Sequence, residues 1–245
     1  AVADFANDTR DPDLDGLSGL LITSLEQSRR LRVLTRGRML DLAREVGGDA
    51  PRIDESVARA IGRRAGVRTL LLASIRKLGD TYAAELRALD PQKDEYLFTL
   101  SEQARGKDEL LPLIDRMSDR TRLALRESEG EVRRSEVKVG EAVTLNLEAY
   151  RHYFHGKERA ARGQFREALA AYRQALEVEP RFALAQVEIA WLGYSSGGPH
   201  AEAWNVIRDA ARSAARAPDK EAGLIRVLQA FFEGRFAAAR AEIRA

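Results

Sequence analysis

Residues 149–180 read AYRHYFHGKERAARGQFREALAAYRQALEVEP, and this stretch decides the fold of the second half of the chain. It divides near Gly163 into two segments of about a dozen residues each, in which apolar side chains recur at helical spacing. In the second segment Ala168, Tyr172 and Ala175 follow an i, i+4, i+7 pattern, which places small and large side chains along one face. Because small residues allow close approach, the pattern predicts two helices that pack together with the tyrosine ring between them.

The same stretch resembles the tetratricopeptide repeat, a helix–turn–helix unit of about 34 residues. The resemblance depends on the glycines, the aromatic and alanine positions of the second helix and the final proline: Gly156, Gly163, Phe165, Ala168, Tyr172, Ala175 and Pro180. The first helix departs from the family pattern, since His152 stands where the family has a large aromatic residue and His155 where it has leucine. Such units stack on one another, and the resemblance implies a scaffold that binds a protein or a peptide.

Two further stretches continue the helical pattern. We expect a second unit over 181–218 and a third from Asp219, where Gly234 and Phe236 repeat the spacing of Gly163 and Phe165. All-α tetratricopeptide repeats are thus expected over 145–245, about two and a half units in all. Because so few repeats are marginal alone, we expect the array to lean on the rest of the chain or on a second copy, as a homodimer.

The first half of the chain alternates between strand and helix patterns. Helices are predicted over 16–28, 38–46, 56–65 and 107–127, and strands over 1–5, 31–35, 69–77, 82–88 and 96–100. The order β-α-β-α-α-β-β-β-α predicts an α/β domain over 1–128, with a mixed sheet in a sandwich with helices. Its first two strands are predicted to form a parallel pair. Residues 129–144 are charged and lack a long apolar period, which indicates a linker.

This first domain resembles the TolB amino-terminal-like family. Residues 2–39, VADFANDTRDPDLDGLSGLLITSLEQSRRLRVLTRGRM, match the family order of strand, Asn-x-(Ser/Thr)-x-Asp-Pro-x-Leu, helix and Leu-Arg-Val strand. Residues 57–91, VARAIGRRAGVRTLLLASIRKLGDTYAAELRALDP, match the helix, strand and Gly-Asp hairpin that follow. In bacterial signalling proteins such as Ser/Thr kinases and adenylate cyclases, domains of this kind stand next to tetratricopeptide arrays. The resemblance implies a sensor or docking module.

Composition excludes several classes of protein. The 245 residues carry 40 basic and 38 acidic side chains, so the positive surface of a nucleic-acid-binding protein is not expected. The chain contains no cysteine, which excludes disulfides, thiolate metal sites and cysteine nucleophiles. No apolar run approaches the roughly 20 residues of a membrane-spanning helix, so we expect no membrane contact by this segment.

Catalytic motifs are not found in the sequence. It contains no phosphate-binding glycine loop, dinucleotide fingerprint or kinase motif, and all three histidines lie in the helical half. We therefore expect no catalytic residues, no cofactor and no enzyme activity in this segment. Both ends resemble cut ends of a longer protein. The family resemblance implies a Ser/Thr kinase domain elsewhere in that bacterial protein, where a membrane anchor also stays open. A cytoplasmic and a periplasmic location both stay open.

Two groups of residues imitate metal sites. Asp11, Asp13 and Asp15 follow the spacing of the first half of an EF-hand loop, but its twelfth position, which needs a bidentate glutamate, is Ile22. A solvated loop is therefore favoured over a calcium site, since carboxylates are also stabilised near a helix N-terminus. His152 and His155 have the spacing of a two-histidine metal pair. We favour partner contact for these histidines and predict no metal.

Two binding hypotheses remain. In the first, the repeats capture a peptide or protein in the concave groove of their first helices, with the following candidate residues: His152, His155, Arg159, Gln186 and Ile189. In the second, the α/β domain is a sensor that binds a small ligand beyond the carboxyl ends of its parallel strands. The loop 6–14 and residues 35–38 would line that site, with Asn7, Thr9, Thr35 and Arg36 as candidates.

Overall fold

The chain forms two compact units, Ala1–Val139 and Gly140–Ala245, which we call the α/β unit and the helical unit. The structure is a computed structural model that describes residues 1–47, 52–134, 138–139, 146–197, 200–213 and 219–244. The combination of an α/β region and an all-helical region, expected from the sequence, is confirmed.

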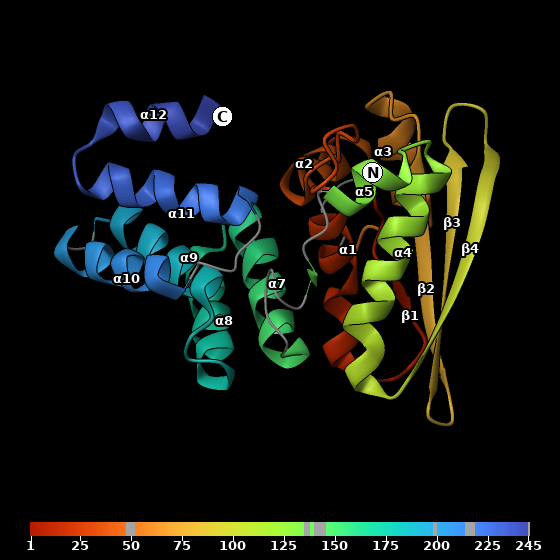
Figure 1. Cartoon of the computed structure of the whole chain (residues 1–245), viewed down its shortest axis with the longest axis horizontal. Coiled ribbons are helices and arrows are strands. Elements are labelled where there is room, and N and C mark those ends of the chain that lie inside the picture. The colour runs from red at the N-terminus through yellow and green to blue at the C-terminus, as the bar shows by residue number, and fades with distance from the viewer. Residues whose placement is uncertain (48–51, 135–137, 140–145, 198–199, 214–218, 245) are drawn as a thin grey trace. The chain divides into compact units, whose positions relative to one another are not determined.

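The α/β unit is built on a four-stranded sheet in the order β1-β2-β3-β4 (Figure 1). The strands are β1 (Ala6–Asn7), β2 (Leu70–Leu78), β3 (Thr81–Asp90) and β4 (Glu95–Arg105). β1 runs parallel to β2, with Ala6 opposite Ser74, whereas β2, β3 and β4 form successive antiparallel hairpins. The predicted mixed sheet is therefore confirmed. The β2–β3 turn uses Gly79 at a φ of 59°, a conformation in which a Cβ would be strained.

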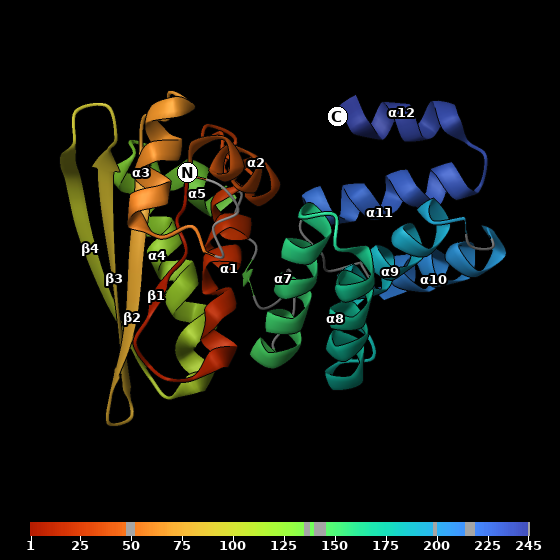
Figure 2. The same cartoon turned by 180° about the vertical axis from the view of Figure 1, so that it is seen from behind.

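One face of this sheet is covered by helices that carry the apolar stripes predicted from the sequence. The first strand is followed by η1 (Pro12–Gly16) and α1 (Leu17–Leu25), and the last by η2 (Lys107–Glu109) and α4 (Leu110–Ala124). α1 and α4 lie side by side on the sheet (Figures 1 and 2). Apolar side chains of both helices and of the sheet are buried between them: Leu17, Leu20, Leu21, Ala73, Ile75, Leu86, Leu113, Ile114 and Met117.

The opposite face of the sheet is covered at one end by α3. Helices α2 (Arg36–Gly47) and α3 (Glu55–Arg64) pack against each other, and α3 also contacts β2. Side chains alternate between faces along a strand, so Arg87 of β3 points away from the face that holds Leu86. Glu55 at the start of α3 contacts Arg87 at 3.3 Å, which places this helix on Arg87's face.

Two predicted strands are wrong in position or type. The first strand is β1, at 6–7, although Val2 also forms an isolated parallel bridge to Leu71. Between them the ladder is interrupted, because Asp4 forms its backbone and side-chain hydrogen bonds with Ile53 instead of β2. Residues 31–35 form no strand, since β2 is the parallel neighbour of β1 and the segment runs directly into α2.

The end of the α/β unit lies further along the chain than 128. Helix α5 (Glu129–Arg134) falls inside the predicted linker, and its Val132 is buried. Val139 is also buried and donates its backbone N–H to the carboxylate of Asp115 on α4 at 3.0 Å. Residues 135–137 and 140–145 of the predicted linker lie outside the described ranges.

The described helices of the helical unit form three consecutive hairpins (Figure 1). They are α7 (Leu147–Ala161) with α8 (Phe165–Val178), α9 (Ala183–Ser195) with α10 (His200–Ser213), and α11 (Asp219–Phe232) with α12 (Phe236–Arg244). Gly163 and Gly234 open the turns of the first and third hairpins with φ values of 74° and 73°. The predicted helix pairs are therefore confirmed, and both hairpins turn in the same way.

Close approach within the first hairpin depends on a glycine. A Cβ placed on Gly156 of α7 would lie 2.3 Å from Cε1 of Tyr172 on α8, a distance that real side chains do not reach. The Tyr172 ring, fully buried, therefore occupies the space that the glycine leaves, as the sequence pattern predicts. Among the helices that the structure describes, none is long and apolar enough to cross a membrane.

Candidate functional site

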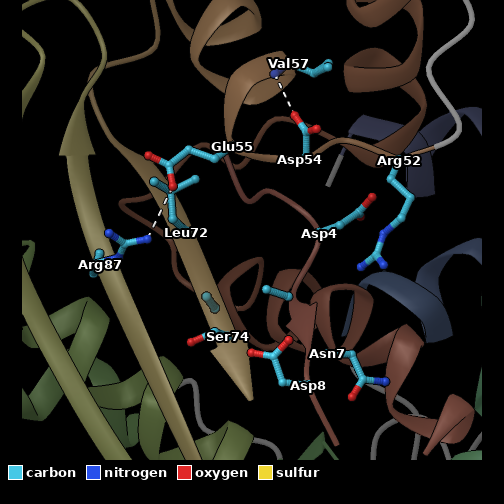
Figure 3. A pocket seen from close by; sticks show the side chains of 12 residues that line it. Asp4, Asn7, Asp8, Arg52, Asp54, Glu55, Val57, Leu72, Ser74 and Arg87 are labelled. Carbon is cyan, nitrogen blue, oxygen red and sulfur yellow. Dashed lines mark hydrogen bonds and ion pairs between the residues drawn. The ribbon is translucent and has the colours of Figure 1, made fainter. Parts of the chain in front are cut away.

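A pocket of about 540 Å³ opens on the face of the sheet that α3 covers only in part. Its floor is formed by β2 at Leu72, Ala73 and Ser74. The β1 segment forms one wall, the N-terminus of α3 another, and Arg87 of β3 closes the third side (Figure 3). The volume falls within the roughly 300–1,000 Å³ that is typical of small-molecule sites.

Most charges of this pocket are already neutralised within the protein. Asp4 forms an ion pair with Arg36 of α2 at 2.6 Å and accepts the backbone N–H of Ile53 at 2.7 Å. Glu55 pairs with Arg59 at 2.6 Å and with Arg87 at 3.3 Å. These groups fix the walls of the pocket, because each carboxylate holds two elements together.

The first turn of α3 has its own carboxylate cap. Asp54 accepts the backbone N–H of Val57 at 3.0 Å and the hydroxyl of Ser56 at 2.7 Å (Figure 3). These hydrogen bonds, that of Val57 first, hold the pKa of Asp54 below its ordinary value of 3.8. The carboxylate is therefore ionised at neutral pH, and the helix terminus is satisfied from within the chain.

Three polar side chains of the pocket keep bonding capacity. Within the described ranges, the Asp8 carboxylate and the Ser74 hydroxyl have no hydrogen-bond or ion-pair partner. Arg52 uses one nitrogen, Nη2, to donate to the carbonyl of Phe5 at 2.7 Å, which leaves its other N–H groups free. The pocket thus presents one free carboxylate, one free hydroxyl and part of a guanidinium.

The loop after β1 was the predicted ligand loop, and the structure shows how it is held. Asn7 donates to the Asp11 carbonyl and to the Asp15 carboxylate, both at 2.8 Å. Its amide oxygen accepts the hydroxyl of Thr9 at 2.6 Å. Lys107 of η2 contacts the carboxylates of Asp11 and Asp13 at 2.8 and 2.6 Å. A lysine ammonium therefore pairs with the carboxylates that would bind calcium in an EF-hand loop.

The four predicted ligand residues do not gather in one site. Asn7 lines the pocket, whereas Thr9 is engaged in the loop and is not part of the lining. Arg36 is not part of the lining but forms an ion pair with the lining residue Asp4, and the Thr35 hydroxyl accepts the backbone N–H of Arg38 at the start of α2. The pocket lies at the end of β1 but beside the middle of β2, whereas the sequence placed the ligand site beyond the carboxyl ends of both parallel strands. Arg52 and Ser74 had no sequence signal, because only the fold brings them together.

In the helical unit the first helices of successive hairpins lie next to one another. Lys157 of α7 contacts Glu188 of α9 at 2.6 Å, and the rings of Trp191 on α9 and Phe231 on α11 lie 6.2 Å apart. Leu224 lies two turns before Phe231 and therefore on the same side of α11. We call the surface formed by these five residues the first-helix face.

The first-helix face exposes apolar side chains. Trp191 is 40% exposed and Leu224 is 43% exposed, although both belong to regular helices. Behind them, Tyr194 and Phe231 pack into the core that joins α9, α10 and α11. The Trp191 ring therefore reaches the surface beside this core.

The predicted partner residues lie elsewhere in the helical unit. His155 and Arg159 each lie two positions from Lys157, and His152 lies five positions from it. At 3.6 residues per turn these separations place all three on the side of α7 opposite Lys157, away from α9. Arg159 donates to Gln164 at the α7–α8 turn, at 3.0 Å.

On α9 the two predicted groove residues serve the fold. Gln186 donates to the carbonyl of Pro180 at 2.9 Å, and Ile189 packs against the buried cluster around Tyr172. Both residues therefore have contacts within the helical unit.

Comparison with known proteins gives little guidance. No protein-family model matches the chain, and no curated protein matches it. Among solved structures, the C-terminal domain of LpoB from Salmonella enterica is similar at 17% sequence identity, with a TM-score of 0.36. The similarity covers 42% of this chain and 79% of that domain. A similarity at this level carries no functional argument. Within the described ranges, no three His, Cys, Asp or Glu side chains could together hold a metal ion.

Proposed function

We propose that this chain is a non-catalytic interaction region of a larger bacterial signalling protein, in which the helical unit binds a protein or peptide. In this proposal the α/β unit is a TolB amino-terminal-like domain and the hairpins are tetratricopeptide repeats. The order of elements in each unit and the Gly156–Tyr172 contact support these assignments. A Ser/Thr kinase domain in the same parent protein is part of the proposal, and it depends on the resemblance alone.

The observation that carries the proposal is the exposure of Trp191 and Leu224 on the first-helix face. Exposed aromatic and aliphatic side chains on neighbouring helices offer apolar area that a partner can bury. The Lys157–Glu188 pair beside them supplies polar contacts at the rim, with Lys157 46% exposed. An apolar strip with a charged end suits an extended or helical peptide with apolar anchor residues.

Selection from a random peptide library on the immobilised chain tests this function. Enriched peptides should carry apolar anchors, and Trp191→Ala should weaken their binding by roughly 30-fold, as expected for a central aromatic contact of about 2 kcal/mol. Phe165→Ala is the matched control, because Phe165 is 51% exposed but begins α8, outside the first-helix face. Failure to enrich any peptide, or equal loss in both variants, would contradict the proposal.

A second candidate function is a small-ligand sensor in the α/β unit. The observation that favours it is the 540 Å³ pocket with its free Asp8, Ser74 and Arg52 groups. A thermal-shift screen with a chemically mixed set of metabolite-sized compounds tests whether the pocket binds any small molecule. The Tm should rise with at least one compound, and loss of that rise in Ser74→Leu, which fills the floor, would assign binding to the pocket.

A further inference from the structure

The pocket of the α/β unit places unused groups of opposite charge around an apolar floor. Asp8 follows β1 and donates its backbone N–H to the Ile75 carbonyl, which sets its side chain next to Ser74. Arg52 comes from the segment before α3, on the other side of Asp4 (Figure 3). Leu72, only 5% exposed, belongs to the floor of the pocket on β2.

Asp8 and Arg52 are exposed and keep bonding capacity that contacts within the protein do not use. Asp4, Asp54 and Glu55 each have internal partners, so Asp8 is the pocket carboxylate that lacks one among the described residues. Arg52 donates one N–H, from Nη2, to the backbone carbonyl of Phe5. Groups with bonding capacity on a shaped cavity wall are the features by which polar ligands are oriented.

We propose that this pocket binds a small zwitterion of the amino-acid class. The ligand's ammonium pairs with the Asp8 carboxylate and donates to the Ser74 hydroxyl. Its carboxylate accepts hydrogen bonds from the free N–H groups of Arg52, whose planar fork suits a carboxylate. An aliphatic side chain rests on Leu72. This inference rests on the second candidate function and is independent of peptide binding by the helical unit.

A ligand with only one charge fits the same walls less well. An amine would leave the Arg52 guanidinium without its anion, and a carboxylic acid would face the unpaired charge of Asp8. Polar groups desolvated without a partner cost affinity, so the two single-charge analogues should bind more weakly than the zwitterion.

Calorimetric titration of the full chain with leucine and two analogues tests the ligand class without any substitution. Isoamylamine lacks the carboxylate of leucine, and 4-methylpentanoate lacks the ammonium. Leucine should bind, and each analogue should bind about tenfold or more weakly, since each loses one charge-assisted contact. Equal affinity for leucine and isoamylamine would overturn the role of Arg52 and with it the zwitterion.

Substitutions then assign the binding to the two charged groups. Asp8→Asn and Arg52→Gln should each reduce leucine affinity by about tenfold or more. The matched controls Asp80→Asn and Arg29→Gln change the same charges at exposed positions outside the pocket and should leave the affinity unchanged. If leucine binding survives both pocket variants, the assignment is wrong.

The outcomes also separate this inference from the functions proposed above. A thermal shift with other compounds but no binding of leucine or of any other free amino acid would overturn the ligand class while the sensor function stands. No shift with any compound would overturn both. Peptide selection by the helical unit is unaffected by either result.

Discussion

The two units of this protein are held together in different ways. In the α/β unit, polar contacts join residues that are far apart in sequence: Ser28 donates to Glu127, 99 positions away, and Lys107 reaches Asp13, 94 positions away. In the helical unit, contacts join neighbouring helices, and Lys157 meets Glu188 only 31 positions away. Contacts between nearby segments therefore stabilise the helical unit, whereas contacts between distant segments stabilise the α/β unit.

The chemistry of the central contacts differs as well. Arg122 and Glu127 form a fully buried bidentate ion pair at 3.0 and 2.7 Å at the end of α4. The corresponding contact of the helical unit is the Tyr172 ring against Gly156, an apolar contact made by shape. The following substitutions test whether each unit depends on its own kind of contact.

Tyr172→Ala should give the largest loss. Removal of a fully buried ring leaves a cavity between α7 and α8, at a cost of about 3–5 kcal/mol in the free energy of unfolding. Both tryptophans of the chain, Trp191 and Trp204, lie in the helical unit, so urea unfolding followed by tryptophan fluorescence reports on this unit.

Tyr172→Phe is the control for this prediction. The buried Tyr172 hydroxyl has no hydrogen-bond partner among the described residues, so its removal should leave the unfolding midpoint unchanged or slightly higher. A large loss in the phenylalanine variant would show that the contact is polar and not apolar.

Arg122→Ala should cost about 3 kcal/mol, the lower end for breaking a buried pair, because Glu127 keeps the hydrogen bond of Ser28. Hydrogen exchange of the β2 and β3 amides is the measurement, since the α/β unit contains no tryptophan. Unchanged exchange rates of these amides would show that the Arg122–Glu127 pair does not stabilise the α/β unit.

The same pair predicts a pH dependence. The Arg122 guanidinium, helped by the Ser28 hydroxyl, holds the pKa of Glu127 below its ordinary value of 4.5 against the effect of burial. Because the folded-state pKa is the lower one, the stabilisation is fully present above about pH 4.5 and is lost as the pH falls through the folded-state pKa. Glu127→Gln should make acid unfolding, followed by circular dichroism, less steep over this range.

The double substitution Arg116→Ser and Arg120→Ser should cost about 1–2 kcal/mol, since Glu102, only 13% exposed, loses both ion-pair partners, and it should also promote association. These arginines of α4 donate to the carbonyls of Gln103 and Ser101 at 2.8 and 2.9 Å on the edge strand β4. Their loss leaves edge groups available to another strand, so light scattering should show association. A variant that stays dispersed would show that the edge needs no cover.

Lys157→Ala should have the smallest effect, about 0.5 kcal/mol, because the lysine of this pair is half exposed and surface pairs are weak. Tryptophan-detected unfolding measures it. A loss as large as that of Tyr172→Ala would end the distinction between the two units, since a polar contact would then also hold the helical unit.

Sequence reasoning predicted the helical unit better than the sheet. The Gly156–Tyr172 contact and the turns at Gly163 and Gly234 follow from spacing within one hairpin. The strand predicted over 31–35 is wrong. Its apolar residues alternate as in a strand, but the parallel neighbour of β1 is β2 at 70–78. Local pattern cannot say which of two candidate strands pairs with the first.

The candidate sites show the same division. Asn7 could be singled out from the sequence, but Arg52 and Ser74 meet it only in the folded sheet. The groove residues chosen from repeat position, such as His155 and Ile189, do not include the exposed Trp191 and Leu224. Exposure of a large apolar side chain depends on how neighbouring hairpins stack, which no single helix encodes.

Local sequence pattern predicts most helices of both units, the two antiparallel hairpins of the sheet and the close contact of α7 with α8, but not helix α5. These features arise from side-chain periodicity and turn residues within a few tens of positions, where the chain needs little conformational entropy to close a contact. Long-range packing within the α/β unit sets the partner of β1, the buried pair of Arg122 and Glu127, and the pocket between β1, β2 and α3. Each of these features joins segments whose local sequence pattern does not indicate their partner, so the packing of the whole unit determines which segments meet.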